Sequence, residues 1–178
     1  MKRSTRNLID TRIAEVLRDN ALFEPPIDLN VIAKRLDVPI RTEQLPKEIS
    51  GFLHRQGTAA VIVVNSRHTR ARQRFTIAHE LGHLILDHKP DQVHVDKSFV
   101  IKFRKAAHVV DPEETQANFF AASLLMPAPM LRDDMKAFDH DGVIPDDFLL
   151  ELTERYGVSM QALIIRLNTL NYTLLMPA

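Results

Sequence analysis

The first part of the chain shows a helical hydrophobic pattern that ends at a pair of prolines. Residues 5–20 place apolar side chains three or four positions apart, which predicts an amphipathic helix. Pro25 and Pro26 interrupt this pattern, and Asp28 can cap a short second helix that reaches Leu36. The chain is therefore expected to open with a long helix and a short one.

Strand-like runs replace the helical pattern after these two segments. Residues 39–42 and 49–54 can form strands, and Gly57 suits a hairpin loop after the second run. Residues 59–65 are rich in β-branched and apolar side chains, which predicts a strand covered on both faces. The runs predict a small sheet of about three strands, whose edge could hold an extended peptide by main-chain pairing.

Residues 75–86 return to helical spacing and are apolar almost all the way round, which predicts a buried helix. The polar stripe of this helix contains His79, Glu80 and His83. The spacing His-Glu-x-x-His places two imidazoles one turn apart with a carboxylate beside them, as in zinc peptidases. Two hydrogen-bonded core histidines are the alternative, but they would also require burial of Glu80, which is unfavourable.

A third metal ligand has to come from farther along the chain. One large class of zinc peptidases carries a glycine and a third histidine three and six positions after the second histidine. Leu86 and Lys89 occupy those positions here, which excludes that class. A second strong helix is predicted over residues 111–127, where Asp111 suits the cap and Pro112 the first helical position.

Two glutamates of this second helix compete for the role of third ligand. Glu114 has Asn118 one turn later on the same face, so Asn118 could brace a ligand histidine. Glu113 is the rival, and Asp111 with Glu114 also has the spacing of a capping box. The pairing with Asn118 favours Glu114.

The C-terminal part predicts a pair of helices over residues 145–170 with a turn at Gly157, similar in spacing to a helix-turn-helix. The second of these helices offers few groups to a DNA groove, namely Gln161, Arg166 and Asn168. The sequence thus favours a helix pair that packs on the core or on a partner. Residues 98–105 are basic and could touch a substrate, although a solvated strand or loop is the simpler interpretation.

Composition limits the class of protein. The 178 residues carry 23 basic and 23 acidic side chains, so no global field attracts nucleic acid or anionic lipid. The sequence contains no cysteine, which excludes disulfides and cysteine-bound zinc. Since no segment approaches the roughly 18 apolar residues of a membrane span, we expect a cytoplasmic protein without a membrane partner.

Four stretches together resemble the ImmA/IrrE family of metallopeptidases. They are Ser50-Gly51-Phe52, Ile62-Val63-Val64-Asn65, Arg74 to His83, and Glu114-x-x-Ala117-Asn118 continuing to Met126-Pro127. The resemblance is close over residues 28–127, and the helix pair around Gly157 is similar to the region that follows the peptidase core in that family. Gln116 stands where relatives often carry a second acidic residue, and His88 lies one place later than a usual histidine and is given no role.

The resemblance implies a mainly helical α+β, minimal zincin-like fold with its small sheet packed on the His-Glu-x-x-His helix. It implies a zincin-like domain over residues 1–140 and a helix-turn-helix-like segment over 141–178. It assigns zinc to His79, His83 and Glu114, with Glu80 as the general base. The expected partner is a helix-turn-helix repressor that the enzyme cleaves in a stress or mobile-element response.

Two functions therefore remain open. In the first, Glu80 takes a proton from a metal-activated water that attacks a peptide bond of the repressor. Zinc is the expected metal, although manganese could support activity in vitro. Tyr156, Tyr172 and the remaining histidines are candidates for stabilising the oxyanion. In the second, a non-catalytic regulator binds a repressor or DNA through its helices, but such a protein would have no use for Glu80.

Overall fold

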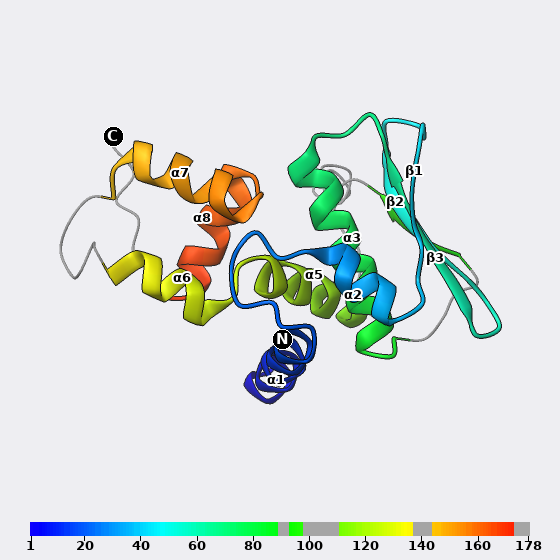
Figure 1. Ribbon diagram of the computed structural model, residues 1–178, viewed down its shortest axis with the longest axis horizontal. Coiled ribbons are helices and arrows are strands. Elements are labelled where there is room, and N and C mark those ends of the chain that lie inside the picture. The colour runs from blue at the N-terminus through cyan, green and yellow to red at the C-terminus, as the bar shows by residue number, and fades with distance from the viewer. Residues whose placement is uncertain (89–92, 98–110, 137–143, 173–178) are drawn as a thin grey trace.

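The computed structural model describes residues 1–88, 93–97, 111–136 and 144–172, which form seven helices and a four-stranded sheet (Figure 1). The helices are α1 (Arg3–Asp19), α2 (Leu29–Arg35), α3 (Arg70–Ile85), α5 (Pro112–Leu125), α6 (Ala128–Met135), α7 (Asp146–Tyr156) and α8 (Met160–Thr169). The strands are β1 (Ile40–Glu43), β2 (Ile49–Gln56), β3 (Ala59–Asn65) and β4 (Val93–Lys97). The predicted α+β class, mainly helical with a small sheet, is confirmed.

The sheet has the strand order β1-β3-β2-β4 and mixes parallel and antiparallel pairs. β2 and β3 form the predicted hairpin, in which Gln56 pairs with Ala59 and Gly57 has a φ of 60°. β1 runs parallel to β3, and β4 pairs antiparallel with β2. β4 is one strand more than the sequence predicts. The basic run 98–105 lies outside the described residues.

Two glycines let α3 pack tightly between the sheet and α5. A Cβ on Gly51 of β2 would meet the carbonyl oxygen of Val63 and lie 2.7 Å from Cγ2 of Thr76 on α3. A Cβ on Gly82 of α3 would lie 3.0 Å from Cδ1 of Phe120 on α5. Because interiors are packed at crystal-like density, a larger residue at either position would push these layers apart. Figure 1 shows the resulting order of sheet, α3 and α5.

One hydrophobic core joins the N-terminal and C-terminal helices. Ile9 and Ile13 of α1 belong to the same buried cluster as Leu152 of α7 and Leu163 of α8. Gly157, at the left-handed φ of 63°, ends α7 at the predicted turn. Both ends of the described chain thus pack on the central layers, and the expected boundary between residues 140 and 141 stays a prediction. No helix among the described residues is long and apolar enough to span a membrane.

Candidate metal centre

Helix α3 carries the predicted polar stripe into the interior. The Thr69 hydroxyl caps the helix by accepting a hydrogen bond from the backbone N–H of Arg72 at 3.4 Å. His79, Glu80 and His83 are 2%, 0% and 4% exposed, so all three polar side chains of the motif are buried. Ionisable groups are rarely buried unless they are paired or bind a metal, which makes this stripe a candidate site.

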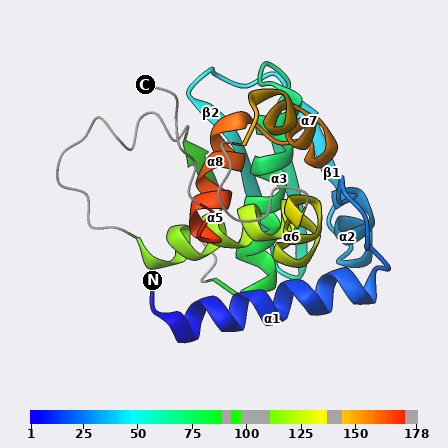
Figure 2. The same cartoon turned by 90° about the vertical axis from the view of Figure 1, so that its left-hand side faces the viewer.

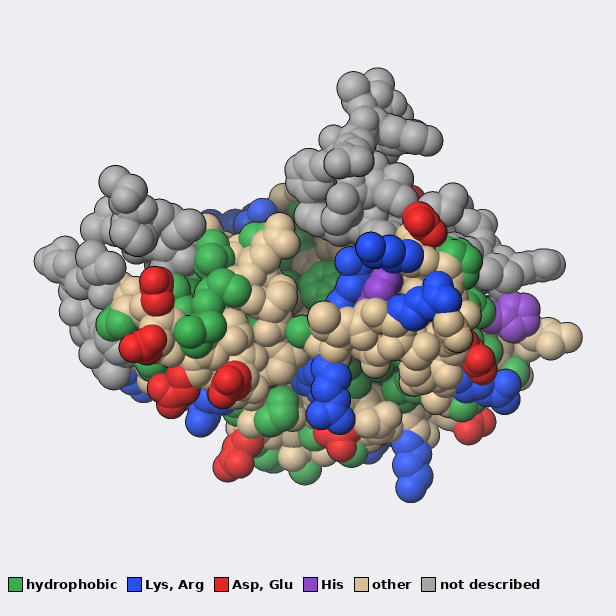
Figure 3. All heavy atoms as spheres, turned by 90° about the horizontal axis from the view of Figure 1, so that it is seen from above, with side chains coloured by type: hydrophobic (Ala, Val, Ile, Leu, Met, Phe, Trp, Pro, Cys, Tyr) green, Lys and Arg blue, Asp and Glu red, His purple; other side chains and the backbone are tan. Residues whose placement is uncertain are grey.

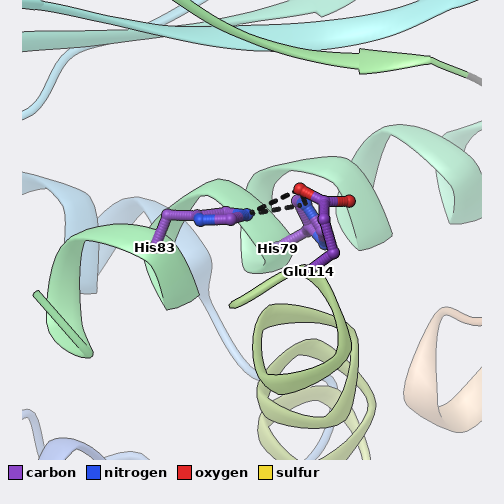
Figure 4. A group of neighbouring side chains, drawn as sticks. All are labelled: His79, His83 and Glu114. Atoms are coloured by element: carbon purple, nitrogen blue, oxygen red, sulfur yellow. Dashed lines mark hydrogen bonds and ion pairs between the residues drawn. The ribbon is translucent and has the colours of Figure 1, made fainter. Parts of the chain in front are cut away.

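Helix α5 presents its first turn to this stripe. Asp111 caps the helix as predicted, with Oδ1 accepting a hydrogen bond from the backbone N–H of Glu113 at 2.8 Å. The cap and Pro112 set the start of α5, so that Glu114 falls on the side that faces α3. Figure 4 shows the Glu114 carboxylate reaching from α5 toward the two imidazoles of α3.

The side chains of His79, His83 and Glu114 converge on one point between the two helices. The Nε2 atoms of the two histidines are 3.0 Å apart. Glu114 Oε1 lies 3.4 Å from Nε2 of His83 and 3.8 Å from Nε2 of His79 (Figure 4). The structure therefore brings Glu114, and not the rival Glu113, into a group that can hold a metal ion.

These spacings fit a small tetrahedral cation. Zinc bonds of about 2.0–2.1 Å at tetrahedral angles place any two ligand atoms roughly 3.3–3.4 Å apart. The observed separations of 3.0, 3.4 and 3.8 Å lie on both sides of that value. Two imidazole nitrogens and one carboxylate are also the ligand set of a known class of catalytic zinc sites that leave a fourth position open.

Asn118 contacts one histidine of this group. Its Oδ1 lies 3.0 Å from Nδ1 of His79. An amide oxygen can only accept a hydrogen bond, so Nδ1 carries the hydrogen and the lone pair of Nε2 faces His83 and Glu114. Asn118, which the sequence predicts to brace a histidine, therefore contacts His79 from α5.

His88 makes a matching contact to the other histidine, a contact that sequence reasoning missed. Its Nδ1 lies 3.1 Å from Nδ1 of His83, and the residue is only 5% exposed. Burial, together with the proximity of His83, lowers the pKa of His88, so the ring is neutral at pH 7 and can accept a hydrogen from His83. The only sequence signal for this contact is that His88 lies one position later than the histidine usual in the family.

Arg55 is a second residue that sequence reasoning missed, because the predicted strand ends at residue 54. It belongs to β2, and its guanidinium donates hydrogen bonds to the carbonyl oxygens of His83 at 3.1 Å and His88 at 3.4 Å. It thereby ties β2 to the end of α3, where the carbonyl oxygen of His83 also accepts a hydrogen bond from the backbone N–H of His88 at 3.1 Å. No local pattern predicts a contact between residues this far apart in the chain.

Several other candidates lie away from the cluster. The Tyr156 hydroxyl is buried and donates a hydrogen bond to Asp134 at 2.7 Å, and Tyr172 packs against the core. Arg166, the one cation proposed to read DNA, is 3% exposed. On the face seen in Figure 3, acidic side chains gather on the side of α7, and basic side chains gather on the side of the sheet and α3.

Comparison with known proteins decides the family. The model of a peptidase family described as the IrrE N-terminal-like domain matches residues 33–168. The chain belongs to this family. The match extends across both helices that carry the candidate metal ligands and through most of α8, and it confirms the resemblance drawn from the sequence motifs.

The matches to individual relatives cover only part of the length of each relative. The radiation response metalloprotease IrrE of Deinococcus radiodurans is 35% identical over 108 residues, which are 61% of this chain and 30% of that protein. An immunity region protein of Bacillus phage phi105 is 30% identical over 96 residues, 54% of this chain and 56% of that protein. This chain thus spans about a third to a half of the length of these relatives.

A solved structure supports the fold alone. A transcriptional regulator of Mycobacterium tuberculosis superimposes with a TM-score of 0.62 at 17% identity, over 93% of this chain and 48% of that one. At this low identity the likeness extends to the arrangement of helices and strands and not to function.

Proposed function

We propose that this protein is a zinc-dependent endopeptidase that cleaves a helix-turn-helix repressor in the cytoplasm. The observation that carries the proposal is the convergence of His79, His83 and Glu114 between α3 and α5, next to the buried Glu80. Membership of a peptidase family supports the same chemistry. The chain's own activity, the substrate and the cellular compartment are all part of this proposal.

Each residue of the group has a distinct role in the proposed reaction. His79, His83 and Glu114 would hold the zinc ion, which when bound acidifies a water molecule and polarises a peptide carbonyl. Glu80, one residue after the first ligand, would take the proton from that water and deliver it to the leaving amine. Asn118 would keep His79 in the tautomer that binds the metal.

The sheet offers a place for the peptide to be cleaved. β4 is an edge strand that pairs with β2, and β2 in turn lies against α3. An edge strand exposes unpaired N–H and C=O groups on its outer side, with which an extended peptide can pair. Such pairing recognises backbone geometry, so a flexible linker of a repressor would be a better substrate than a folded domain.

A repressor as substrate agrees with the kind of relative found. The Bacillus phage phi105 relative is an immunity region protein, and the Deinococcus relatives are radiation response metalloproteases. Both names connect members of the family to regulated genetic responses. We propose that the helix pair α7–α8 forms the segment after a domain boundary near residue 140 and contributes to holding the repressor.

The alternative function, a non-catalytic regulator that binds a repressor or DNA, is less well supported. Arg166 is buried, and α7 exposes Asp146, Asp147, Glu151 and Glu154, which would repel phosphates. The buried Glu80 beside the ligand histidines also has no role in such a protein.

The test is co-expression of the protein with the helix-turn-helix repressors encoded beside its gene, followed by mass spectrometry of the fragments. Wild type should yield one defined cleavage, and Glu80→Gln should abolish it while still binding zinc. A Glu113→Gln variant serves as the matched control and should cleave like wild type. A fragment that persists in Glu80→Gln, or wild-type protein that binds no stoichiometric zinc, would refute the proposal.

A further inference from the structure

A large groove lies on the opposite end of α5 from the metal ligands. It has a volume of about 940 Å³ and is bounded by α1, the second half of α5, the start of α6 and the end of α8. Figure 2 shows α1 running beneath α5 and α6 along this side of the molecule. Most of its wall is apolar, including Ile13, Leu17, Leu22, Met130 and Leu170. None of the three candidate metal ligands lines it.

One buried cation lines this apolar groove. Arg166 is 3% exposed and donates a hydrogen bond from Nε to the carbonyl oxygen of Met126 at 3.1 Å. Its two terminal nitrogens have no hydrogen bond to any part of the chain that the structure describes. Burial lowers the pKa of Arg166 to about 10, which still leaves the guanidinium charged at neutral pH. A charged donor pair is thus available inside the groove.

A buried hydroxyl lies in the same wall. Ser123 of α5 is 1% exposed and lines the groove. Its Oγ makes no hydrogen bond within the described chain. A buried hydroxyl without a partner is unfavourable, so it calls for an acceptor or donor supplied from the groove.

The charges around the groove leave a surplus of positive charge. Arg6, Arg132 and Arg166 all interact electrostatically with the single carboxylate of Asp10. The guanidinium carbons of Arg6 and Arg166 also lie 5.8 and 5.9 Å from the centre of the Phe119 ring. These side chains all line the groove, so an aromatic ring and several cations meet in one place.

We propose that this groove is a binding site for a small amphiphilic anion, a carboxylate or phosphate group joined to an apolar body. The apolar wall would bury the body, and Arg166 with Arg132 would pair with the anionic group, which matches the usual composition of small-molecule sites. The ligand would touch Phe119 and Ser123 on the helix whose first turns carry Glu114 and Asn118. It would therefore bind within reach of the metal centre without contacting it.

Calorimetric titration with three defined probes tests the proposal. Decanoate and decyl phosphate should each bind saturably with one site per chain, and they distinguish a carboxylate from a phosphate preference. Decanol, which lacks the charge, should bind at least about tenfold more weakly, since a charge-assisted pair is lost. Equal binding of decanol and decanoate, or no saturable binding of either anion, would overturn the proposal.

Variants then assign the binding to this groove. Arg166→Gln should weaken decanoate binding by about 10- to 100-fold. Because Arg166 is buried and its loss could unfold the protein, Arg132→Gln and Ala14→Trp provide independent tests at exposed positions that line the groove.

Arg132→Gln should weaken binding, and Ala14→Trp should fill the groove and block binding. Arg41→Gln is the matched control, because Arg41 is an exposed arginine of β1 outside the groove, and it should bind decanoate like wild type. Unchanged binding in both Arg132→Gln and Ala14→Trp would place the probe elsewhere and refute the site. The measurement needs neither zinc nor peptidase activity, so its failure is separate from failure of the proposed function.

Discussion

Replacing Asn118 by alanine should weaken zinc binding while leaving the metal-free fold almost unchanged. The substitution removes the acceptor that lies 3.0 Å from Nδ1 of His79, and the imidazole then loses its fixed tautomer and orientation. Removing such an outer hydrogen bond to a ligand histidine typically lowers metal affinity by about 10- to 100-fold, or about 1.4–2.7 kcal/mol.

The metal-free protein should respond much less to the same change. Loss of one hydrogen bond destabilises a fold by about 0.5–1.5 kcal/mol. Alanine recovers about half of a kcal/mol through its higher helix propensity, since Asn118 lies inside α5. The expected net change in the free energy of unfolding without metal is therefore below about 1 kcal/mol.

Two measurements separate these effects. Zinc affinity is measured by competition with a chromophoric chelator, and stability is measured by urea unfolding in the presence of EDTA. Asn168→Ala is the control, since Asn168 is an exposed asparagine of α8, and it should change neither value much. A zinc affinity of Asn118→Ala within twofold of wild type would refute the orienting role of Asn118.

Three further changes test how the site and the surrounding fold are held in place. Gly51→Ala should lower the free energy of unfolding by about 1–3 kcal/mol in urea titrations, because its methyl group would lie 2.7 Å from Thr76. Arg55→Gln should weaken zinc binding several-fold and speed amide hydrogen exchange near His83, because two hydrogen bonds at the end of α3 are lost. Unchanged hydrogen exchange would contradict the role of Arg55 in holding this end of the helix. Burial and the hydrogen bond that its hydroxyl donates to Asp134 raise the pKa of Tyr156. The neutral hydroxyl therefore stabilises the fold fully below about pH 10, the pKa of an unfolded tyrosine, and this contribution is lost progressively at higher pH. Tyr156→Phe should therefore lower the free energy of unfolding by about 1 kcal/mol at pH 8 and make its decrease at alkaline pH shallower, as measured by unfolding at a series of pH values. An unchanged decrease at alkaline pH would exclude Tyr156 as its origin.

Local sequence signals predicted much of the fold. Asp28 and Asp111 accept the capping hydrogen bonds expected of them, and Gly57 and Gly157 have the positive φ of the predicted turns. These features depend on a few neighbouring residues, so the sequence contains all the information that determines them. The buried character of the His-Glu-x-x-His helix was equally clear, because its apolar residues cover nearly the whole circumference.

Features that depend on contacts between residues far apart in the chain could not be predicted from the sequence. β4 lies in a stretch without a clear pattern, and its pairing with β2 comes from the tertiary fold. The contacts of Arg55 and His88 with the end of α3 join separate elements, so their spacing in the sequence carries no signal. The parallel pairing of β1 with β3 likewise depends on how the intervening β2 folds back.

The choice between Glu113 and Glu114 shows where the limit lies. Both residues belong to the first turn of α5, and a helix places their side chains about 100° apart. Only the face of α5 that packs on α3 can supply a ligand. The packing of Phe120 against Gly82 determines which face that is. A larger residue at position 82 would therefore disturb the metal group through the distance between the two helices, without altering any ligand. The site is thus a property of the contact between α3 and α5, and the motif on α3 provides only part of it.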